Sequence, residues 1–87
     1  MRIDIGKFGN ALISRPEGRE AFLSARAYIL KKDEKEFVLD FINVEVLTPS
    51  WADEFISAIK KEFVHTAIIY ENTTNPSVQE SLKWVSN

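Results

Sequence analysis

The chain has 87 residues, of which 45% are hydrophobic, and its 11 basic and 13 acidic side chains give a formal net charge of -2. This length allows one domain with a single core, and the apolar share is that of a folded chain rather than a disordered one. The mixed signs exclude the basic footprint of a nucleic-acid or membrane-surface binder, and the absence of cysteine excludes disulfides, thiolate catalysis and Cys-based zinc sites.

The first predicted element is a strand at the N-terminus. Residues 1–5, MRIDI, alternate apolar and charged side chains, which is the period of a half-buried strand, and we expect it at an edge of the sheet. Gly6 and Gly9 follow and predict a turn.

A helix should start at Ser14. Ser14 and Glu17 have the spacing of a capping box, and Pro16 is tolerated in the first helical turn. The apolar stripe that would face the core consists of Ala21, Phe22, Ala25, Ile29 and Leu30. Gly18 lies inside this helix, where it costs about 1 kcal/mol relative to alanine, so we expect either tight packing or fraying there.

The central part of the chain predicts a strand, a helix and a strand. Residues 37–41 and 66–70 are nearly continuous apolar runs, typical of interior strands with both faces covered. Between them, an apolar stripe with helical spacing consists of Ala52, Phe55, Ile56, Ile59 and Phe63. Such a crossover makes the two strands parallel and brings the start of the helix to the carboxyl edge of the sheet, where α/β folds hold their sites.

The last predicted element is a helix that begins at Asn75, followed by Pro76 and a second Ser-to-Glu box. Its apolar stripe is Val78, Leu82 and Val85. The predicted fold is therefore one small α/β domain over residues 1–87, in the order β-α-β-α-β-α, with a mostly parallel sheet.

The stretch VLTPSWADEFI, residues 46–56, holds the polar residues at the predicted start of the middle helix. Thr48 before Pro49 is a favourable N-cap. Asp53 and Glu54 suit the positive end of a helix, and adjacent helical residues point about 100° apart, which disfavours a shared catalytic role. Trp51 lies off the apolar stripe; it either is exposed, as a binding residue would be, or folds back on Phe55.

Asp40 interrupts an apolar strand and must find donors or a cation. We expect Arg15 to be its partner in a structural polar pair, with a role in ligand or partner binding as the alternative. Arg15 and Arg19 lie on one helical face, where they serve solvation or together hold a phosphate or a partner's acid.

His65 is the one histidine of the chain and has no cysteine or second histidine with which to share a metal. Packing or exposure at the end of a strand is the simpler expectation for it. Trp84, off its apolar stripe, either seals the last helix or serves a dimer contact. Gly6 and Gly9 lack the other glycines and the lysine of a nucleotide-binding loop, so no cofactor and no metal site are predicted.

Three stretches, LISRPEGREAFL, FVLDFINVEVLTPSWADEFI and ENTTNPSVQESL, together resemble the STAS-like domain family of unknown function. The resemblance runs from Ile13 to Leu82 and rests on a Ser-Arg helix start, an Asp-Phe strand and an Ala-Asp-Glu-Phe helix start. It implies a domain similar to the anti-sigma-factor antagonists, which belong to bacterial signalling and bind an ATPase-fold serine kinase or an anti-sigma factor.

In that wider superfamily the partner docks at the turn before the helix, and phosphorylation of a serine there breaks the complex. The resemblance places this turn at residues 47–51. The serine position falls on Pro49, which cannot accept a phosphate, and leaves Thr48 and Ser50 as candidate phosphorylation positions.

We therefore expect a non-catalytic regulatory module whose partner-binding residues are Thr48, Pro49, Ser50, Trp51, Asp53 and Glu54. Its partner would be an ATPase-fold, histidine-kinase-like protein, by resemblance. The alternatives are a small enzyme or ligand-binding domain that uses Asp40, Asp53, Glu54 or His65, and a self-associating structural subunit such as a homodimer. No apolar run is long enough to span a bilayer, and residues 1–10, MRIDIGKFGN, lack the apolar core of a signal peptide, so the expected location is the cytoplasm.

Overall fold

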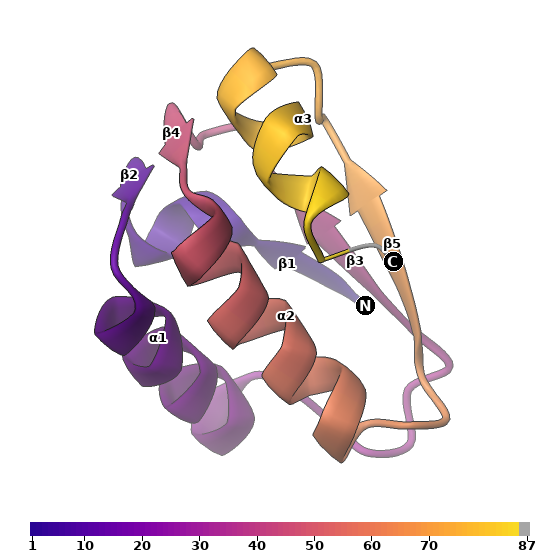
Figure 1. Cartoon of the computed structure of the whole chain (residues 1–87). Helices are drawn as coiled ribbons and strands as arrows, with labels where there is room; N and C mark the ends of the chain where they lie inside the picture. The colour runs from indigo at the N-terminus through magenta and orange to yellow at the C-terminus, as the bar shows by residue number, and fades with distance from the viewer. Residues whose placement is uncertain (86–87) are drawn as a thin grey trace.

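The computed structural model describes residues 1–85 as a parallel sheet with its helices packed on one side (Figure 1). In chain order the elements are β1 (Arg2–Asp4), the 3-10 helix η1 (Ile5–Phe8), β2 (Ala11–Leu12), α1 (Arg15–Tyr28), β3 (Glu36–Asp40), β4 (Val46–Leu47), α2 (Pro49–Glu62), β5 (Ala67–Glu71) and α3 (Pro76–Lys83). The expected α/β order is confirmed, and η1 and the short strands β2 and β4 are additions to it. No helix in residues 1–85 is long and apolar enough to cross a membrane.

The main sheet has the order β1-β3-β5, and both of its pairings are parallel. This confirms the parallel arrangement expected for the two central strands and the edge position expected for the first. The register aligns Asp4, Asp40 and Glu71, which end the three strands, side by side. The carboxyl edge of the sheet is therefore acidic.

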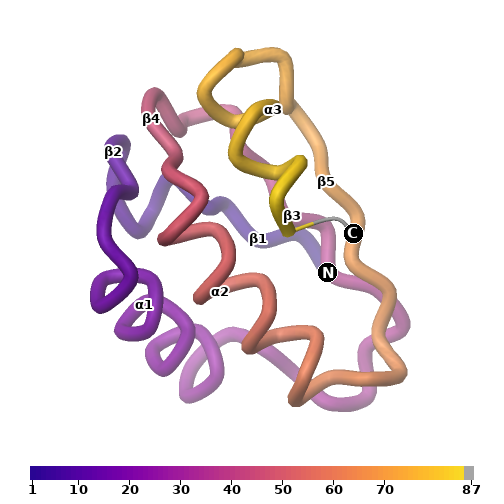
Figure 2. Tube along the Cα trace, viewed as in Figure 1, coloured from indigo at the N-terminus to yellow at the C-terminus, as the bar shows by residue number. Residues whose placement is uncertain are grey.

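A second, two-stranded parallel sheet joins β2 to β4, with Ala11 opposite Val46 and Leu12 opposite Leu47. Each short strand leads directly into a helix, β2 into α1 and β4 into α2, and Figure 2 shows the two strands side by side at one end of the molecule. The pairing fixes the starts of α1 and α2 next to each other.

The core lies between the sheet and the helices. On the sheet side it takes Ile3, Phe37 and Leu39, all at most 3% exposed. On the helix side it takes the stripes expected from the sequence, and the ring of Phe63 meets the ring of Phe37 edge-on, with centroids 5.2 Å apart. The helical stripes predicted from periodicity therefore belong to the core, except that Ile29 is half-buried and packs against it, and the core also takes Ile5, Leu47 and Trp51, which the stripes left out.

The opposite face of the sheet is open, so the expectation that residues 37–41 and 66–70 form strands covered on both faces is wrong. In β3, buried Phe37 and Leu39 alternate with half-buried Val38 and Asp40. In β5, Ile69 is 39% exposed, and the strand lies at the edge of the sheet. The reason is that the helices of the described chain gather on one side, as Figure 1 shows.

The helix starts follow the capping residues of the sequence. Ser14 accepts a hydrogen bond at Oγ from the backbone N–H of Glu17 at 3.2 Å, and Glu17 accepts one from the N–H of Ser14, which completes the predicted capping box. Asn75 caps α3 by accepting from the N–H of Ser77 at 2.7 Å. Local chemistry is thus enough to set both of these helix starts.

Gly18 marks the closest approach of α1 and α2. A Cβ atom added at Gly18 would lie 2.8 Å from the backbone oxygen of Trp51 and 3.2 Å from Cβ of Glu54. Of the two expectations for this glycine, tight packing is confirmed. A glycine here lets the first turn of α2 rest directly on the backbone of α1.

Candidate functional site

The turn that leads from β4 into α2, residues 48–54, is the segment predicted to bind a partner; we call it the α2 turn. Its Pro49 and Ser50 are exposed, whereas Thr48, Asp53 and Glu54 are half-buried. Trp51 is 1% exposed. The α2 turn therefore presents only part of the predicted residue set to solvent.

Thr48 is held in place by two hydrogen bonds. Its Oγ1 accepts from the backbone N–H of Trp51 at 3.3 Å, which caps α2, and the hydroxyl donates to the backbone oxygen of Ile13. The second bond joins the start of α2 to the segment before α1. Thr48 is thus a structural cap, as its position before Pro49 predicts, and its hydroxyl is occupied.

Trp51 belongs to the core, so its prediction as an exposed binding residue is wrong and the alternative, that it folds back on Phe55, is confirmed. Its ring stacks on that of Phe55, with centroids 4.8 Å apart and planes at 20°, and lies 6.2 Å from the ring of Phe8. The burial of Trp51 could not be predicted from the apolar stripe of α2, because Trp51 lies outside that stripe. It is covered instead by η1, whose Phe8 packs against it. Trp51 anchors the α2 turn from below.

An ion pair crosses from α1 to the α2 turn. Nη1 of Arg15 lies 2.7 Å from Oδ2 of Asp53 and 3.9 Å from Oε2 of Glu54. Ser57 also donates to Asp53, at 3.0 Å. The bond from Arg15, and then that from Ser57, lower the pKa of Asp53 below its ordinary value. Asp53 is therefore held in its charged form by the Arg15 guanidinium, which also lies near Glu54.

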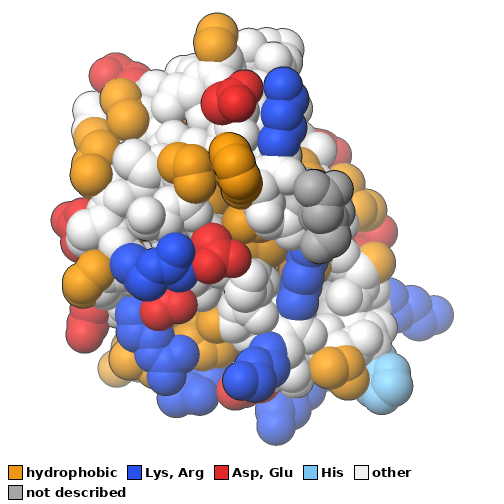
Figure 3. All heavy atoms as spheres, viewed as in Figure 1, with side chains coloured by type: hydrophobic (Ala, Val, Ile, Leu, Met, Phe, Trp, Pro, Cys, Tyr) orange, Lys and Arg blue, Asp and Glu red, His pale blue; other side chains and the backbone are white. Residues whose placement is uncertain are grey.

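Exposed apolar side chains flank the α2 turn. Ile13, just after β2, is 46% exposed, and Val46 in β4 is 40% exposed. Figure 3 shows hydrophobic side chains at the surface in this region, at the upper left, and mixed blue and red side chains over α1 and α2 below them. An apolar patch with a charged border is the composition of a protein-binding surface.

The comparison with protein families bears on this segment. A model of the STAS-like domain of unknown function (DUF4325) matches residues 25–78, more than half of the chain. The chain belongs to this family. The match includes β3, β4 and the whole of α2, so the resemblance stated from the sequence is confirmed. No curated protein and no solved structure matches the chain.

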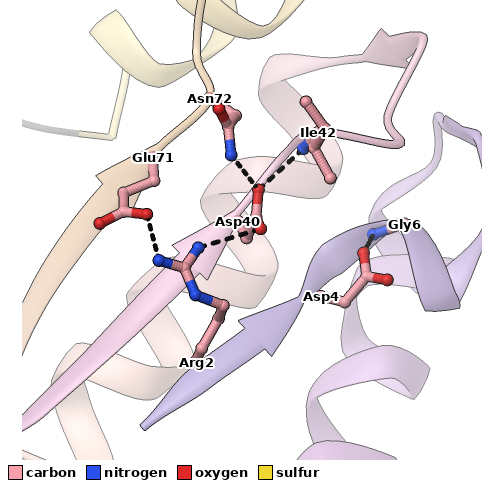
Figure 4. Close-up of polar contacts among 7 residues, drawn as sticks. All are labelled: Arg2, Asp4, Gly6, Asp40, Ile42, Glu71 and Asn72. Carbon is pink, nitrogen blue, oxygen red and sulfur yellow. Dashed lines mark hydrogen bonds and ion pairs between the residues drawn. The ribbon is translucent and has the colours of Figure 1, made fainter.

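In this STAS-like domain, Asp40 has other partners than the expected Arg15, so the predicted Asp40–Arg15 pair is wrong. Oδ1 of Asp40 accepts from Nδ2 of Asn72 at 2.7 Å and from the backbone N–H of Ile42 at 3.0 Å, and Oδ2 accepts from Nη1 of Arg2 at 3.0 Å (Figure 4). Asn72, followed by Ile42 and Arg2, lowers the pKa of Asp40.

The geometry of the sheet explains this exchange of partners. Asp40 lies on the open face, because its neighbours in β3 point toward the helices, and Arg15 belongs to a helix on the other side. Arg2 stands on the open face of the adjacent β1 and also pairs with Glu71 of β5. The open face is therefore crossed by a structural ionic network.

The remaining candidate residues are not brought together. His65 is exposed and lines a groove of about 250 Å³ with Lys32 and Glu62, away from Asp40, Asp53 and Glu54. Within residues 1–85, no three His, Cys, Asp or Glu side chains are placed to hold a metal ion. Trp84 is 69% exposed, so it does not seal α3.

Proposed function

We propose that this STAS-like domain is a non-catalytic regulatory module that binds an ATPase-fold, histidine-kinase-like protein through the α2 turn. The observation that supports this proposal is the exposed apolar pair Ile13 and Val46 beside the exposed Pro49 and Ser50. Apolar residues bordered by charge are suited to desolvation against another protein. The partner class follows from the family's likeness to anti-sigma-factor antagonists.

The rigidity of the α2 turn also supports binding. Trp51 is packed beneath it, Thr48 ties it to Ile13, and Arg15 is bound to Asp53. A surface that is already ordered loses little conformational freedom on association. The partner would therefore bind an ordered surface, in which the exposed Pro49 and Ser50 are supported by the contacts of Thr48, Trp51 and Asp53.

Of the two candidate phosphorylation positions, we assign regulation to Ser50. The Thr48 hydroxyl is engaged twice, as cap and as donor to Ile13, whereas the Ser50 side chain is exposed and, among the described residues, makes no hydrogen bond. A phosphate on Ser50 would add about -1.5 to -2 charges close to Asp53 and Glu54, and would oppose binding by repelling an acidic partner surface or by its desolvation cost against an apolar one.

The proposal is tested by titration calorimetry with a purified ATPase-fold kinase encoded next to the gene of this chain. Ser50→Arg places a long cation on the exposed turn and should weaken binding at least about tenfold, a loss of roughly 1.4 kcal/mol. The matched control is Ala27→Arg, an exposed position near the far end of α1.

The control variant should bind like the wild type, and circular dichroism should show both variants folded. Equal affinity of the Ser50→Arg variant and the wild type would overturn the assignment of the α2 turn. Absence of any heat with the wild-type domain would overturn the proposed partner class.

A further inference from the structure

A groove lies between α1 and the segment that carries η1 and β2, with one residue of α2 at its base; these elements are at the left of Figure 1. It has a volume of about 500 Å³, within the range of binding sites in proteins. Its apolar floor consists of Phe8, Leu12, Ala21 and Trp51, and the last three are at most 7% exposed. A side chain that enters the groove therefore meets closely packed apolar surface.

The charges that line the groove are all negative. Glu17 and Glu20, one turn apart on α1, are both exposed at its rim, and no lysine or arginine lines it. Oε1 of Glu17 accepts from Ser14 in the capping box, which leaves Oε2 unengaged. No ion pair within residues 1–85 involves Glu17 or Glu20. The groove therefore combines an apolar floor with a rim that attracts cations.

The arginines of α1 are turned away from this groove. Arg15 binds Asp53 of α2, and the guanidinium groups of Arg19 and Arg26 lie 5.8 and 5.5 Å from the centre of the Phe22 ring. At about 100° per residue, each of these arginines lies at least about 100° around the helix from either glutamate. Helix α1 thus separates its charges, with acids toward the groove and cations toward α2.

The short strand β2 adds a pair of backbone groups. The oxygen of Asn10 accepts from the N–H of Val46 at 3.0 Å. The oxygen of Leu12 accepts from the N–H of Thr48, also at 3.0 Å. Because backbone groups of successive strand residues point to opposite sides, the N–H and C=O of Ala11 point away from β4, where no strand of residues 1–85 pairs with β2. Ala11 also lines the groove, so a chain that passes there can bond to its backbone.

We propose that this groove binds an extended segment of a partner protein through an arginine or lysine side chain of that segment. Such a side chain joins an aliphatic stem to a charged head, which matches an apolar floor with an acidic rim. The stem lies on Phe8 and Leu12, the head binds Glu17 and Glu20 by charge-assisted hydrogen bonds, and the backbone of the segment bonds to Ala11.

This inference does not depend on the protein that binds the α2 turn. Of the α2 turn, only the buried Trp51 lines the groove, whereas the exposed Pro49 and Ser50 lie outside it. The basic segment can therefore belong to a different partner.

The proposal is tested by NMR titration of the isotope-labelled domain with the peptide acetyl-Gly-Arg-Gly-amide. At millimolar concentration this probe should shift the backbone amides of Ala11 and Ala21, and the shifts should saturate. The same peptide with citrulline in place of arginine keeps the length and shape of the side chain but lacks its charge. It should bind at least about tenfold more weakly.

A pair of double variants tests the two acids. Glu17→Gln combined with Glu20→Gln should weaken binding of the arginine peptide at least about tenfold, and it should stay folded because glutamine also completes a capping box. The matched control combines Glu36→Gln with Glu45→Gln, at exposed positions that do not line the groove. It changes the net charge by the same amount and should bind like the wild type.

Three results would overturn the proposal. The first is the absence of shifts at the groove with the arginine peptide at millimolar concentration. The second is equal affinity of the arginine and citrulline peptides, or equal weakening in the two double variants, because binding would then not depend on the acids of the groove. The third is binding of methylguanidinium as tightly as the peptide, which would assign the groove to a free small cation and not to a chain bonded to Ala11.

Discussion

At the scale of single residues, Asp40 shows how one carboxylate orders the open face of the sheet. Its bonds from Asn72, Ile42 and Arg2 lower its pKa in the folded protein. A pKa lowered by folding stabilises the fold above the unfolded-state pKa, about 3.9, and this stabilisation is lost as the pH falls through the lower, folded-state value.

We therefore predict that Asp40→Asn lowers the thermal midpoint at pH 7 and that the difference from wild type shrinks as the pH falls below about 3.9. Calorimetric melting at several pH values measures this. Asp33→Asn, at an exposed position without a side-chain bond to another described residue, is the control and should melt like the wild type. A difference for Asp40→Asn that is constant with pH would contradict the electrostatic explanation.

Trp51 gives the second prediction at this scale. Because its ring is stacked on Phe55 and 1% exposed, Trp51→Ala should reduce the free energy of unfolding by about 3 to 5 kcal/mol. Trp84→Ala, at a ring that is 69% exposed, should change it by less than about 0.5 kcal/mol. Urea unfolding of the two variants checks this, and similar effects of both substitutions would contradict the assigned burial.

The sequence predicted the helix caps correctly but not the side chains that bind Asp40. Thr48 and Ser14 were predictable because a cap bonds within three residues of itself. The partner of Asp40 depends on strand order and register, which bring Arg2 from 38 residues away. Arg2 lies on the polar face of the predicted first strand and was a possible partner for Asp40. It could be chosen only once β1 is known to pair with β3.

At the scale of elements, the contact between α1 and α2 depends on Gly18. Helix propensity alone favours Gly18→Ala by about 1 kcal/mol, but the added Cβ would meet the backbone oxygen of Trp51 at 2.8 Å. Overpacking against backbone costs about 1 to 3 kcal/mol, so we predict a net loss of stability on Gly18→Ala.

The measurement is chemical unfolding, with Ala27→Gly on the exposed side of the same helix as the comparison. That variant should lose about 1 kcal/mol from propensity alone. A Gly18→Ala variant more stable than the wild type would show that the two helices can move apart without cost.

The three helices and three main strands were predictable because each has caps or apolar periodicity over several residues. Strands β2 and β4 were not, because two residues carry no period, and their pairing becomes visible only when α1 and α2 are placed together. The open face of the sheet was also not predicted. Continuous apolar runs such as residues 66–70 are typical of strands covered on two sides, yet here they include the exposed Ile69.

At the scale of the whole molecule, the order β1-β3-β5 predicts how the sheet opens. Strand β3 has partners on both sides, whereas β1 and β5 have one each within residues 1–85. The amide of Val38 in β3, which donates to the oxygen of Met1 on the β1 side at 2.8 Å, should therefore stay protected from exchange with deuterium when β5 frays.

Native-state hydrogen exchange of the dilute protein, followed by NMR, measures this order. Amides of β5 should exchange faster than that of Val38, because an edge strand frays more easily than a central one. Slower exchange in β5 than in β3 would contradict the strand order.

The short pairing of β2 with β4 has an electrical consequence for the molecule. It starts α1 and α2 at the same end and sends them in the same direction, so their peptide dipoles add instead of cancelling. Several charged side chains suit this polarity, with Glu17 in the first turn of α1 and Arg26, Lys60 and Lys61 in the last turns of the two helices. The basic side chains oppose the negative pole at the end of each helix, and Glu17 opposes the positive pole at the start of α1, which eases the contact between two like dipoles.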